Sequence, residues 1–395
     1  MIQLKDICDI YDCPHTTAKD EGKGYPLVRT PNVGKGRLIL DGIHRVSEDV
    51  YNSRNARAIP EEGDLILARE APVGNVSIIM DGQRVCLGQR VVLIKPKREL
   101  VDPHFLTYYL LSAEVQHRLK NHANGAVVAH LNVSDIRNLW VTLPELEEQV
   151  AIGKILRSID DKIELNRQIN DNLEQQAQAL YKSWFVDFEP FKDGAFKESE
   201  FGLIPEGWRV GSLSDLTEIT MGQSPSGKSY NETGDGMLFY QGRAEFGDRY
   251  PSIRLYTTEP SRIAEQNSVL LSVRAPVGDT NIAYNKCCIG RGLASITAKH
   301  GFNSFIFYMI KSLKDQFDLY NGEGTVFGSI NRDSLNSMKV IVPTNEVIND
   351  FEKIVAPLDF KYKSLFSENL LLKQQRDTLL PKLMSGELKI NDLDC

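Results

Sequence analysis

The sequence contains no long hydrophobic run and few cysteines. Every window of about 18 residues is interrupted by polar or charged side chains, so no membrane-spanning helix is expected. The opening stretch, MIQLKDICDI, carries charges and has no apolar signal core, which predicts a cytoplasmic protein. The six cysteines are scattered, at positions 8, 13, 86, 287, 288 and 395. Such spacing is typical of reduced thiols and not of a disulfide framework.

Positive charge is also scarce. The 46 Lys and Arg residues are outnumbered by 53 Asp and Glu residues, and the net charge is −7. This balance is weak evidence against a nucleic-acid partner. However, residues 1–145 hold 18 basic and 18 acidic side chains, and residues 190–345 hold 16 and 17. The acidic excess therefore lies outside two near-neutral regions, each of which can still present one basic face.

Motifs for group-transfer and nuclease chemistry are missing. We find no Gly-x-Gly loop in the setting that S-adenosylmethionine requires, no Asn/Asp-Pro-Pro-aromatic motif and no clear Pro-Asp…Glu-x-Lys motif. The chain is therefore predicted to catalyse nothing alone. Cys8, Cys13 and His15 suggest a zinc site, but a fourth ligand is missing. Buried thiols are the favoured interpretation, and no metal site is predicted.

One stretch matches a nucleotide-binding motif. Residues 222–229, GQSPSGKS, fit the pattern G-x-x-x-x-G-K-[ST]. The pattern binds phosphates where a buried strand leads into the loop and a helix leaves it. Residues 213–220 are half polar, and residues 230–236 favour turns over a helix. A chance match is the favoured interpretation, and nucleotide binding through Lys228 is the alternative.

The second half of the chain is a diverged copy of the first. Arg69-Glu-Ala-Pro-Val-Gly74 recurs as Arg274-Ala-Pro-Val-Gly278. Residues 124–132, NGAVVAHLN, align without gaps on residues 323–331, EGTVFGSIN, at an offset of 199 residues. A period this long excludes a solenoid and indicates two copies of one large unit.

Each copy is predicted to have a globular part and a long helix. The globular part has short β-branched runs punctuated by Gly and Pro, which indicates a mixed α/β domain dominated by strands. Residues 102–122 and their counterpart, residues 302–320, are predicted helices. A longer helix follows in each copy, with apolar residues every seven positions. The predicted seam consists of Ile152, Ile159, Asn166, Leu173, Leu180, Phe351, Leu358, Leu365, Leu372 and Leu379, widened by Ile155, Ile163, Ile169, Ile354 and Tyr362.

The repeated heptads predict that the two helices pair antiparallel as a coiled coil. A solvent-exposed helix would leave two leucine-rich stripes uncovered. A helix of about 37 residues is about 55 Å long. Asn166 interrupts the seam with a polar residue of the kind that can fix register. The expected architecture is two similar globular heads held apart by a two-helix rod.

Three stretches of the sequence resemble the specificity subunit of Type I restriction–modification enzymes. The stretch LPELEEQVAIGKILRSIDDKIELNRQINDNLEQQAQALYKSWFVDFEPF is similar to the central conserved helix of that family. The next, ESEFGLIPEGWRVGSLSDL, is similar to the entry into its second target-recognition domain, and LLKQQRDTLLPKLMSGEL to its distal conserved helix. The resemblance covers most of the chain, and its central stretch is long and specific.

The resemblance implies an α/β (α+β) fold with a pseudo-twofold internal repeat. Two similar globular target-recognition domains, residues 1–145 and 190–345, would be separated by a two-helix antiparallel coiled coil. The central conserved helix would occupy residues 146–189 and the distal conserved helix residues 346–390. In that family the two domains each read one half of a split sequence in double-stranded DNA.

The resemblance also implies partners. The helices would dock two methyltransferase subunits and, through the complex, restriction and motor subunits, without a role at a membrane. S-adenosylmethionine, ATP and magnesium would belong to those partners, and this chain would hold no cofactor. Two alternatives stay open from the residues alone: a nucleotide-binding protein acting through residues 222–229, and a protein-interaction scaffold.

Comparison of the two copies suggests residues that read bases. Positions that a shared scaffold needs should agree, as Asn132 and Asn331 do, whereas positions that read different half-sites can differ. Ala126 and Thr325 differ, as do His130 and Ser329. Basic residues beside turn-rich segments are further DNA-binding candidates. They are Arg29, Lys35, Arg37, Arg45, Arg54, Arg57, Arg90, Lys228, Arg243, Arg249, Arg254 and Arg291.

An aromatic stripe follows the first long helix. Tyr181, Trp184, Phe185 and Phe188 recur at helical spacing. Packing between the helix and the second head is the favoured interpretation. The alternative is a docking site for a methyltransferase subunit, because aromatic residues are enriched at interaction hot spots.

Overall fold

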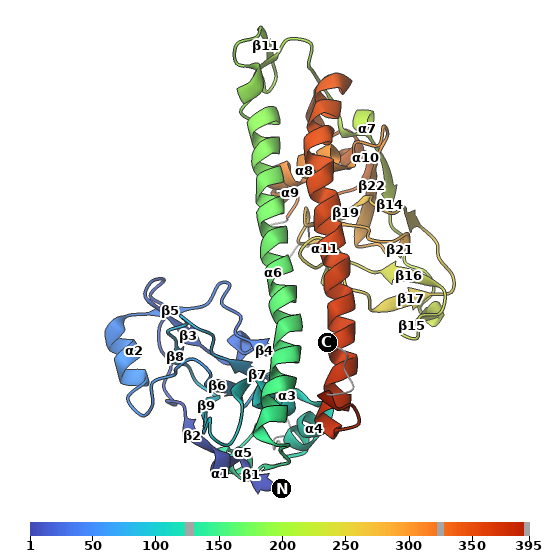
Figure 1. Ribbon diagram of the computed structural model, residues 1–395. Coiled ribbons are helices and arrows are strands. Elements are labelled where there is room, and N and C mark those ends of the chain that lie inside the picture. The colour runs from blue at the N-terminus through green and yellow to red at the C-terminus, as the bar shows by residue number, and fades with distance from the viewer. Residues whose placement is uncertain (123–129, 322–327, 391–395) are drawn as a thin grey trace. The chain divides into compact units, whose positions relative to one another are not determined.

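The computed structural model describes residues 1–122, 130–321 and 328–390. The chain forms two compact units, one of Met1–Asn166 with Ser367–Cys395 and one of Arg167–Phe366 (Figure 1). Each unit contains one head and part of each of two long helices, α6 (Leu146–Phe185) and α11 (Asn345–Ser385). Among the helices of the described ranges, none combines the length and hydrophobicity that a membrane span requires.

A five-stranded sheet forms the centre of the first head. Its strand order is β2-β9-β6-β7-β4. The strands are β2 (Cys8–Asp12), β9 (Val91–Pro96), β6 (Leu65–Ala68), β7 (Val76–Ile78) and β4 (Gly36–Arg37). Leu65 and Leu67 face one hydrophobic core, and Ile66 and Ala68 face another. Because both faces of β6 are covered, its sequence is a continuous apolar run and does not alternate.

Helices cover one face of this sheet. They are α3 (Pro103–Leu111), α4 (Ala113–His122) and the short α5 (Val133–Arg137). The sequence predicted one helix over residues 102–122, but the chain breaks at Ser112, whose backbone is extended. The carbonyl of Ser112 accepts the amide of Gln116, so Ser112 starts a new helix, as serine commonly does. The other face packs against a sheet of β5 (Arg45–Val46), β3 (Tyr25–Val28) and β8 (Cys86–Leu87), and α2 (Glu48–Arg54) packs against this second sheet.

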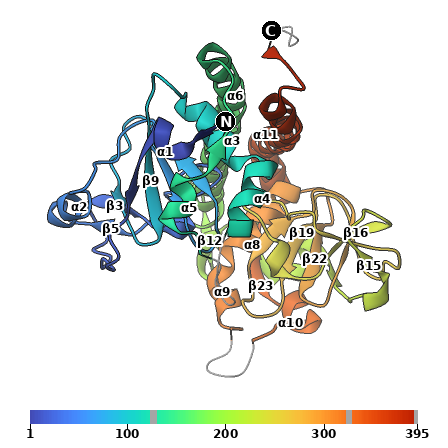
Figure 2. The same ribbon diagram turned by 90° about the horizontal axis from the view of Figure 1, so that it is seen from below.

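The second head repeats this arrangement. Its main sheet has the order β14-β22-β19-β20, and Figure 2 shows α8 beside it. Leu271 pairs with Ala294 as Leu67 pairs with Val92 in the first head. The strands are β14 (Thr217–Met221), β22 (Leu293–Ala298), β19 (Val269–Ser272) and β20 (Thr280–Ile282); the helices are α8 (Asn303–Ser312), α9 (Lys314–Asp318) and α10 (Arg332–Asn336). A second sheet holds β15 (Tyr230–Asn231), β17 (Leu255–Thr257), β16 (Met237–Tyr240), β21 (Cys287–Ile289) and β18 (Ile263–Ala264).

Short elements connect the heads to the long helices. The first head begins with β1 (Ile2–Gln3) and α1 (Leu4–Ile7), and β1 pairs with β10 (Trp140–Val141) just before α6. The second head has the same arrangement of β13 (Arg209–Ser212), α7 (Leu213–Leu216) and β23 (Lys339–Val342) before α11. A hairpin of β11 (Phe196–Ser199) and β12 (Gly202–Pro205) follows α6.

The two long helices have 40 and 41 residues and carry the predicted seam. All ten residues of the main heptad series are buried or half-buried. The seam has a second inward position that the sequence analysis only partly found. It is occupied by Gln149, Leu156, Ile163, Asn170, Ala177, Ile348, Val355, Tyr362, Asn369, Arg376 and Leu383. Several of these residues are polar, so they do not extend an apolar pattern, whereas Ile354 extends it and is 45% exposed.

Polar residues join the two helices in the first unit. Asn166 Nδ2 donates to Glu368 Oε2 at 2.8 Å and to Asn369 Oδ1 at 2.9 Å. Asn369 Nδ2 donates in turn to the carbonyl of Ile163 at 3.2 Å. Since these buried amides find partners in one alignment of the helices, they favour a single antiparallel register.

A buried tyrosine–aspartate pair fixes each head to a long helix. Tyr108 Oη donates to Asp160 Oδ2 at 2.7 Å in the first unit, and Tyr308 Oη donates to Asp359 Oδ1 at 2.8 Å in the second. An arginine neutralises each carboxylate, but it comes from different places. Arg376 of α11 donates to Asp160 at 2.8 Å, whereas Asp359 is paired at 2.6 Å with Arg249 of the head.

In each unit, the position that corresponds to the arginine of the other unit holds a small residue. Gly36 lies beside Asp160, where an added Cβ would be 3.5 Å from Oδ2. It holds the place in the first head that Arg249 holds in the second, next to strands β7 and β20 respectively. Ala177 of α6 is fully buried and stands 199 residues before Arg376, at the repeat offset. The two units therefore share one buried carboxylate and exchange the source of its counter-charge.

Candidate functional site

Four segments of the first head meet at one end of its main sheet. Strands β2 and β6 finish there, and β9 begins there. The fourth segment precedes α5, because the Leu131 amide donates to the Arg69 carbonyl at 3.0 Å. We call this the loop end of the sheet. It brings together Arg90 and His130, two of the predicted DNA-binding residues.

Arg69 is the centre of a polar cluster at the loop end. Its Nε donates to the carbonyl of Leu131 at 2.8 Å, and its Nη1 donates to Asp12 Oδ1 at 2.9 Å. Its Nη2 lies 2.7 Å from His130 Nε2. Since a guanidinium can only donate, Nε2 of His130 accepts, which places the imidazole proton on Nδ1. The Arg69 side chain is 8% exposed and holds the cluster together from inside.

Glu70 completes this cluster. Nδ1 of His130 lies 2.6 Å from Glu70 Oε1, and Arg90 forms an ion pair with Oε2. The Glu70 side chain is 12% exposed, whereas those of His130 and Arg90 are 34% and 61% exposed. Both carboxylate oxygens are engaged within the protein, so Arg90 presents the remaining donors to solvent. The first-head cluster consists of Asp12, Arg69, Glu70, Arg90 and His130.

Backbone hydrogen bonds identify the same place in the second head. The Arg69 amide donates to the Arg90 carbonyl at 2.9 Å, and the Val273 amide donates to the Gly292 carbonyl at 3.0 Å. The amide of Ile330, just before α10, donates to the Val273 carbonyl at 3.1 Å, as its counterpart does in the first head. Val273 therefore stands at the place of Arg69.

This correspondence corrects the alignment made from sequence. The motif match paired Arg69 with Arg274, but Arg274 takes the place of Glu70, because the first copy has one more residue between its arginine and the Ala-Pro dipeptide. The backbone is shared, and the side chains are not. In the second head, Met221 stands at the place of Asp12, Val273 at that of Arg69 and Arg274 at that of Glu70. Gly292 stands at the place of Arg90, and Ser329 at that of His130.

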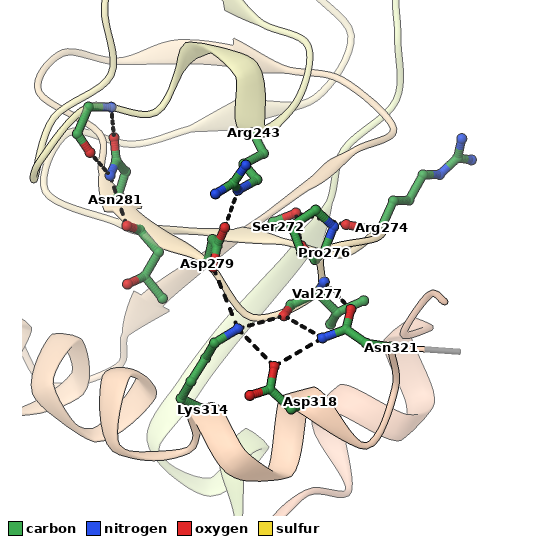
Figure 3. Close-up of polar contacts among 12 residues, drawn as sticks. Arg243, Ser272, Arg274, Pro276, Val277, Asp279, Asn281, Lys314, Asp318 and Asn321 are labelled. Atoms are coloured by element: carbon green, nitrogen blue, oxygen red, sulfur yellow. Dashed lines mark hydrogen bonds and ion pairs between the residues drawn. The ribbon is translucent and has the colours of Figure 1, made fainter. Parts of the chain in front are cut away.

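The loop that carries Arg274 is held from its inner side (Figure 3). Ser272 Oγ donates to the carbonyls of Arg274 and Pro276, both at 2.9 Å. Asn321 Oδ1 accepts the amide of Val277 at 2.6 Å. The Arg274 side chain is exposed and extends away from these contacts. Within the described parts of the chain it makes no side-chain hydrogen bond or ion pair.

A pocket of about 540 Å³ lies beside this loop. Arg243, a predicted DNA-binding residue, forms an ion pair there with Asp279 (Figure 3). Lys314 Nζ lies 3.5 Å from Asp279 and 2.9 Å from Asp318, and it donates to the Val277 carbonyl at 3.3 Å. The charges of Arg243 and Lys314 are thus balanced by carboxylates, and Lys311, which also lines the pocket, is paired with Glu174.

The remaining predicted DNA-binding residues differ in exposure. Arg29 and Arg37 are half-buried, and Arg37 pairs with Asp161 of α6. Ala126 and Thr325 lie outside the described residues. Two exposed arginines extend the loop end, Arg57 beside the Asp12 carbonyl and Arg291 next to Gly292. The exposed candidates are Lys35, Arg45, Arg57, Arg90, Lys228, Arg243, Arg254, Arg291 and Ser329.

Two predicted DNA-binding arginines are buried, so that prediction is wrong for them. Arg54 donates through Nε to the Leu87 carbonyl at 2.6 Å and through Nη1 to the Thr16 carbonyl at 2.9 Å. Arg249 pairs with Glu174 of α6 and with Asp359 of α11, and its side chain is 2% exposed. Neither guanidinium can reach a phosphate or a base without leaving its partners.

The aromatic stripe on α6 belongs to the core of the second unit. Tyr181 and Phe185 are 7% and 6% exposed, and Phe185 packs 4.9 Å from Phe305 between ring centroids. Trp184 and Phe188 are partly buried against the same core. The suggested docking role is therefore wrong for Tyr181 and Phe185, whose rings are covered by the chain itself, and it stays a prediction for Trp184 and Phe188.

The nucleotide-binding pattern at residues 222–229 lacks the helix that its chemistry requires. Gly227–Ser229 form one turn of 3-10 helix, and strand β15 follows directly. Ser229 is buried, and its hydroxyl contacts the Thr257 hydroxyl at 2.7 Å. No helix N-terminus within this described segment can therefore receive a phosphate.

We expect ATP to leave the protein unchanged. With millimolar ATP and magnesium, the melting temperatures of the wild type and of Lys228→Ala should equal those without nucleotide. Differential scanning fluorimetry measures this directly. A nucleotide-dependent stabilisation of the wild type that Lys228→Ala abolishes would contradict the structural interpretation.

The thiols and His15 do not form a metal site in the described ranges. Burial raises the pKa of the Cys8 thiol to about 12 and raises that of Cys13 as well. His15 is exposed and lies 3.1 Å from Asp12. Across residues 1–122, 130–321 and 328–390, no three His, Cys, Asp or Glu side chains are grouped so as to hold a metal ion.

Comparison with known proteins shows which family has this sequence pattern and architecture. The family model of the type I restriction modification DNA specificity domain matches residues 1–175 and 205–359. A Methanocaldococcus jannaschii protein described as the specificity subunit of the type I restriction enzyme MjaX is 33% identical over 399 residues, which cover 98% of this chain and 93% of that protein. The HindI specificity subunit of Haemophilus influenzae is 26% identical over 84% of this chain and 88% of its own length.

A solved structure has the same fold. The crystal structure of the S subunit of a type I restriction–modification system from M. genitalium aligns with a TM-score of 0.62 at 16% identity, covering 97% of this chain and 95% of that one. With the repeated heads and the antiparallel helices, these matches confirm the resemblance. The chain belongs to the family of type I restriction–modification DNA specificity subunits.

Proposed function

We propose that this chain is the non-catalytic specificity subunit that recognises a bipartite sequence in double-stranded DNA. Each head reads one half-site with the loop end of its main sheet. The observation that carries the proposal is that both heads build this end on the same backbone hydrogen bonds and fill it with different side chains. A shared scaffold with different polar groups is what two different half-sites require.

The chemistry of the loop ends supports DNA as the ligand. Arg57 and Arg90 are exposed at one, and Arg274 and Arg291 at the other. Arginines of this kind hold phosphates and read guanine in the major groove. Discrimination of about 1–3 kcal/mol for each good base contact would be the source of specificity. Binding would weaken with salt, because phosphate contacts release counterions.

The long helices would set the distance between the half-sites and dock the partners. One helical turn of DNA spans roughly 34–36 Å, and α6, with 40 residues, is about 60 Å long. We propose two methyltransferase subunits as direct partners, with restriction and motor subunits joining through the complex. S-adenosylmethionine, ATP and magnesium would be bound by those subunits, and the methyltransferase would flip the target base.

The methylation pattern of a host genome tests this function. Co-expression of this chain with its methyltransferase subunit in an unmethylated host should produce modified bases within a split motif that has a fixed unspecified gap. Single-molecule sequencing reports both half-sites at once. Replacing residues 1–145 by the corresponding head of a relative should change one half-site of the modified motif and leave the other half-site unchanged.

The opposite result would favour a protein-interaction scaffold. It would be the absence of any new modification, with both proteins folded and associated and the methyltransferase active with another specificity subunit. The near-neutral heads are the feature that suggests this second function, because a strongly basic face is the usual footprint of DNA binding.

A further inference from the structure

We propose that Arg274 reads a guanine in the half-site of the second head, and that Glu70, at the same place in the first head, instead positions Arg90 for that role. This inference rests on the proposed function and assigns the base-reading residues within it. The shared place is the second residue of the turn between β6 and β7 in one head and between β19 and β20 in the other.

The setting of Arg274 is that of a presented side chain. Its backbone carbonyl accepts from Ser272, and the neighbouring Ala275 amide donates to the Gly328 carbonyl at 3.0 Å. Asn321 fixes the next part of the turn through the amide of Val277. The turn is therefore held before any ligand arrives, while the guanidinium extends outward (Figure 3). A side chain on a rigid base loses less freedom on binding and can select one geometry.

Other arginines of the second head are engaged differently. Arg243 pairs with Asp279, Arg254 lies 2.7 Å from Glu245, and Arg249 is buried between two carboxylates. Among the described residues no side chain occupies the donors of Arg274, and their fork matches the O6 and N7 acceptors of guanine in the major groove. The Arg274 guanidinium is therefore suited to a bidentate base contact at this loop end, and its turn is held by the contacts of Ser272 and Asn321.

The first head reaches a related result through a different residue. Glu70 uses one oxygen for His130 and the other for Arg90, so both oxygens are already engaged within the protein. The pair it forms fixes the direction of Arg90, whose side chain is 61% exposed. Arg90 starts from another strand end than Arg274, so the two heads would place a guanine-reading fork over different base positions. Glu70 is thus a positioning residue.

The test uses the complex of this chain with its methyltransferase subunits and duplexes carrying the motif found by sequencing. Each guanine of the second half-site is replaced in turn by 7-deazaguanine, which removes the N7 acceptor. The wild type should lose affinity about 5- to 150-fold at one of these guanines. Arg274→Ala, which removes both hydrogen bonds, should bind the unmodified duplex with at least this loss and be insensitive to 7-deazaguanine at that position. Its preference in the first half-site should be unchanged.

A matched control is Arg209→Ala. Arg209 is an exposed arginine of the same head, paired with Asp215 near the start of β14, at the other end of the sheet. Arg209→Ala removes the same charge as Arg274→Ala. It should leave the recognised motif and the sensitivity of binding to 7-deazaguanine unchanged. Glu70→Gln should relax the base preference in the first half-site only, whereas Glu70→Asp should recover part of it. Melting temperatures of all variants identify any loss of folding.

Three results would overturn the inference. Arg274→Ala could weaken binding equally for all sequences with an unchanged motif, as a phosphate contact would. It could leave both affinity and motif unchanged. Finally, the second half-site could contain no guanine. Failure of the proposed function itself is distinguishable, because the wild-type complex would then yield no split motif.

Discussion

Arg249→Ala is expected to lower the free energy of unfolding of the second unit by about 3–5 kcal/mol, the usual result of removing one partner from a buried ion pair. Its guanidinium lies 2.8 Å from Glu174 and 2.6 Å from Asp359, and the substitution leaves these carboxylates facing each other with less compensation. The arginine also stacks 4.6 Å from the ring centroids of Phe307 and Tyr362, so packing is lost as well.

The charges of this network depend on one another. Burial acts to lower the pKa of Arg249, but Asp359, Tyr308 and Glu174 hold it above its usual value. Burial acts to raise the pKa of Glu174, but Arg249 and Lys311 hold it below its usual value. Without Arg249, Glu174 would retain only Lys311, at 2.6 Å, as its close cation. Arg249→Ala should therefore lower the melting temperature by about 6–20 °C.

The structure offers a rescue variant for this prediction. In the first unit, Gly36 and Arg376 hold the places that Arg249 and Ala177 hold in the second. Arg249→Gly combined with Ala177→Arg therefore rebuilds the arrangement of the first unit and should recover part of the lost stability. Arg262→Ala, on an exposed arginine of the same head, should change the melting temperature little. A loss below about 1 kcal/mol for Arg249→Ala would contradict the structural role.

Phe185→Ala should destabilise the second unit by a similar amount, about 3–5 kcal/mol, because it opens a cavity in a core of aromatic rings. Phe185 is 6% exposed, and its ring centroid lies 5.0 Å from that of Phe351 and 5.8 Å from that of Trp208. These rings come from α6, α11 and the segment before β13, so the substitution loosens three parts of the unit at once. Urea unfolding measures the change.

The neighbouring residue provides the control. Val186 is 50% exposed, and Val186→Ala should leave stability nearly unchanged. If Phe185→Ala instead kept its wild-type unfolding midpoint but no longer associated with a methyltransferase subunit, the ring would be a docking residue and the assignment to the core would be incorrect. Measuring association for both variants at a temperature below their transitions separates the two roles.

The sequence predicted the features that repeat and missed those that depend on three-dimensional neighbours. The long helices were accessible because the heptad series recurs at a constant offset. The second seam position was only partly found, since Asn170 and Arg376 are polar: Asn170 is buried, and Arg376 is half-buried and paired with Asp160. The break at Ser112 was missed for a different reason, because apolar residues on both sides continue a helical pattern that the backbone does not follow.

The candidate site shows the same division. His130 and Ser329 were found because the gapless alignment compared true counterparts. Glu70 and Arg274 were missed as counterparts, because the arginines in the two copies of the motif drew the alignment one residue away from the backbone correspondence. Arg249 was misassigned, since nothing near it in the chain reveals that two helices supply its carboxylates. Counting residues back from the shared Ala-Pro dipeptide would have revealed the first error.

The different sources of the buried arginine restrict how such a protein can be recombined. A copy of the first head grafted into the second place would bring a glycine toward Asp359, and Ala177 would offer no charge in return. The reverse graft would place two arginines, one from the head and Arg376 from the helix, around the single carboxylate of Asp160. Each head thus matches the buried charges of its own position on the long helices and not those of the other position. A replacement for the first head must therefore carry a small residue at the place of Gly36, and a replacement for the second head an arginine at the place of Arg249, if each carboxylate is to keep one counter-charge.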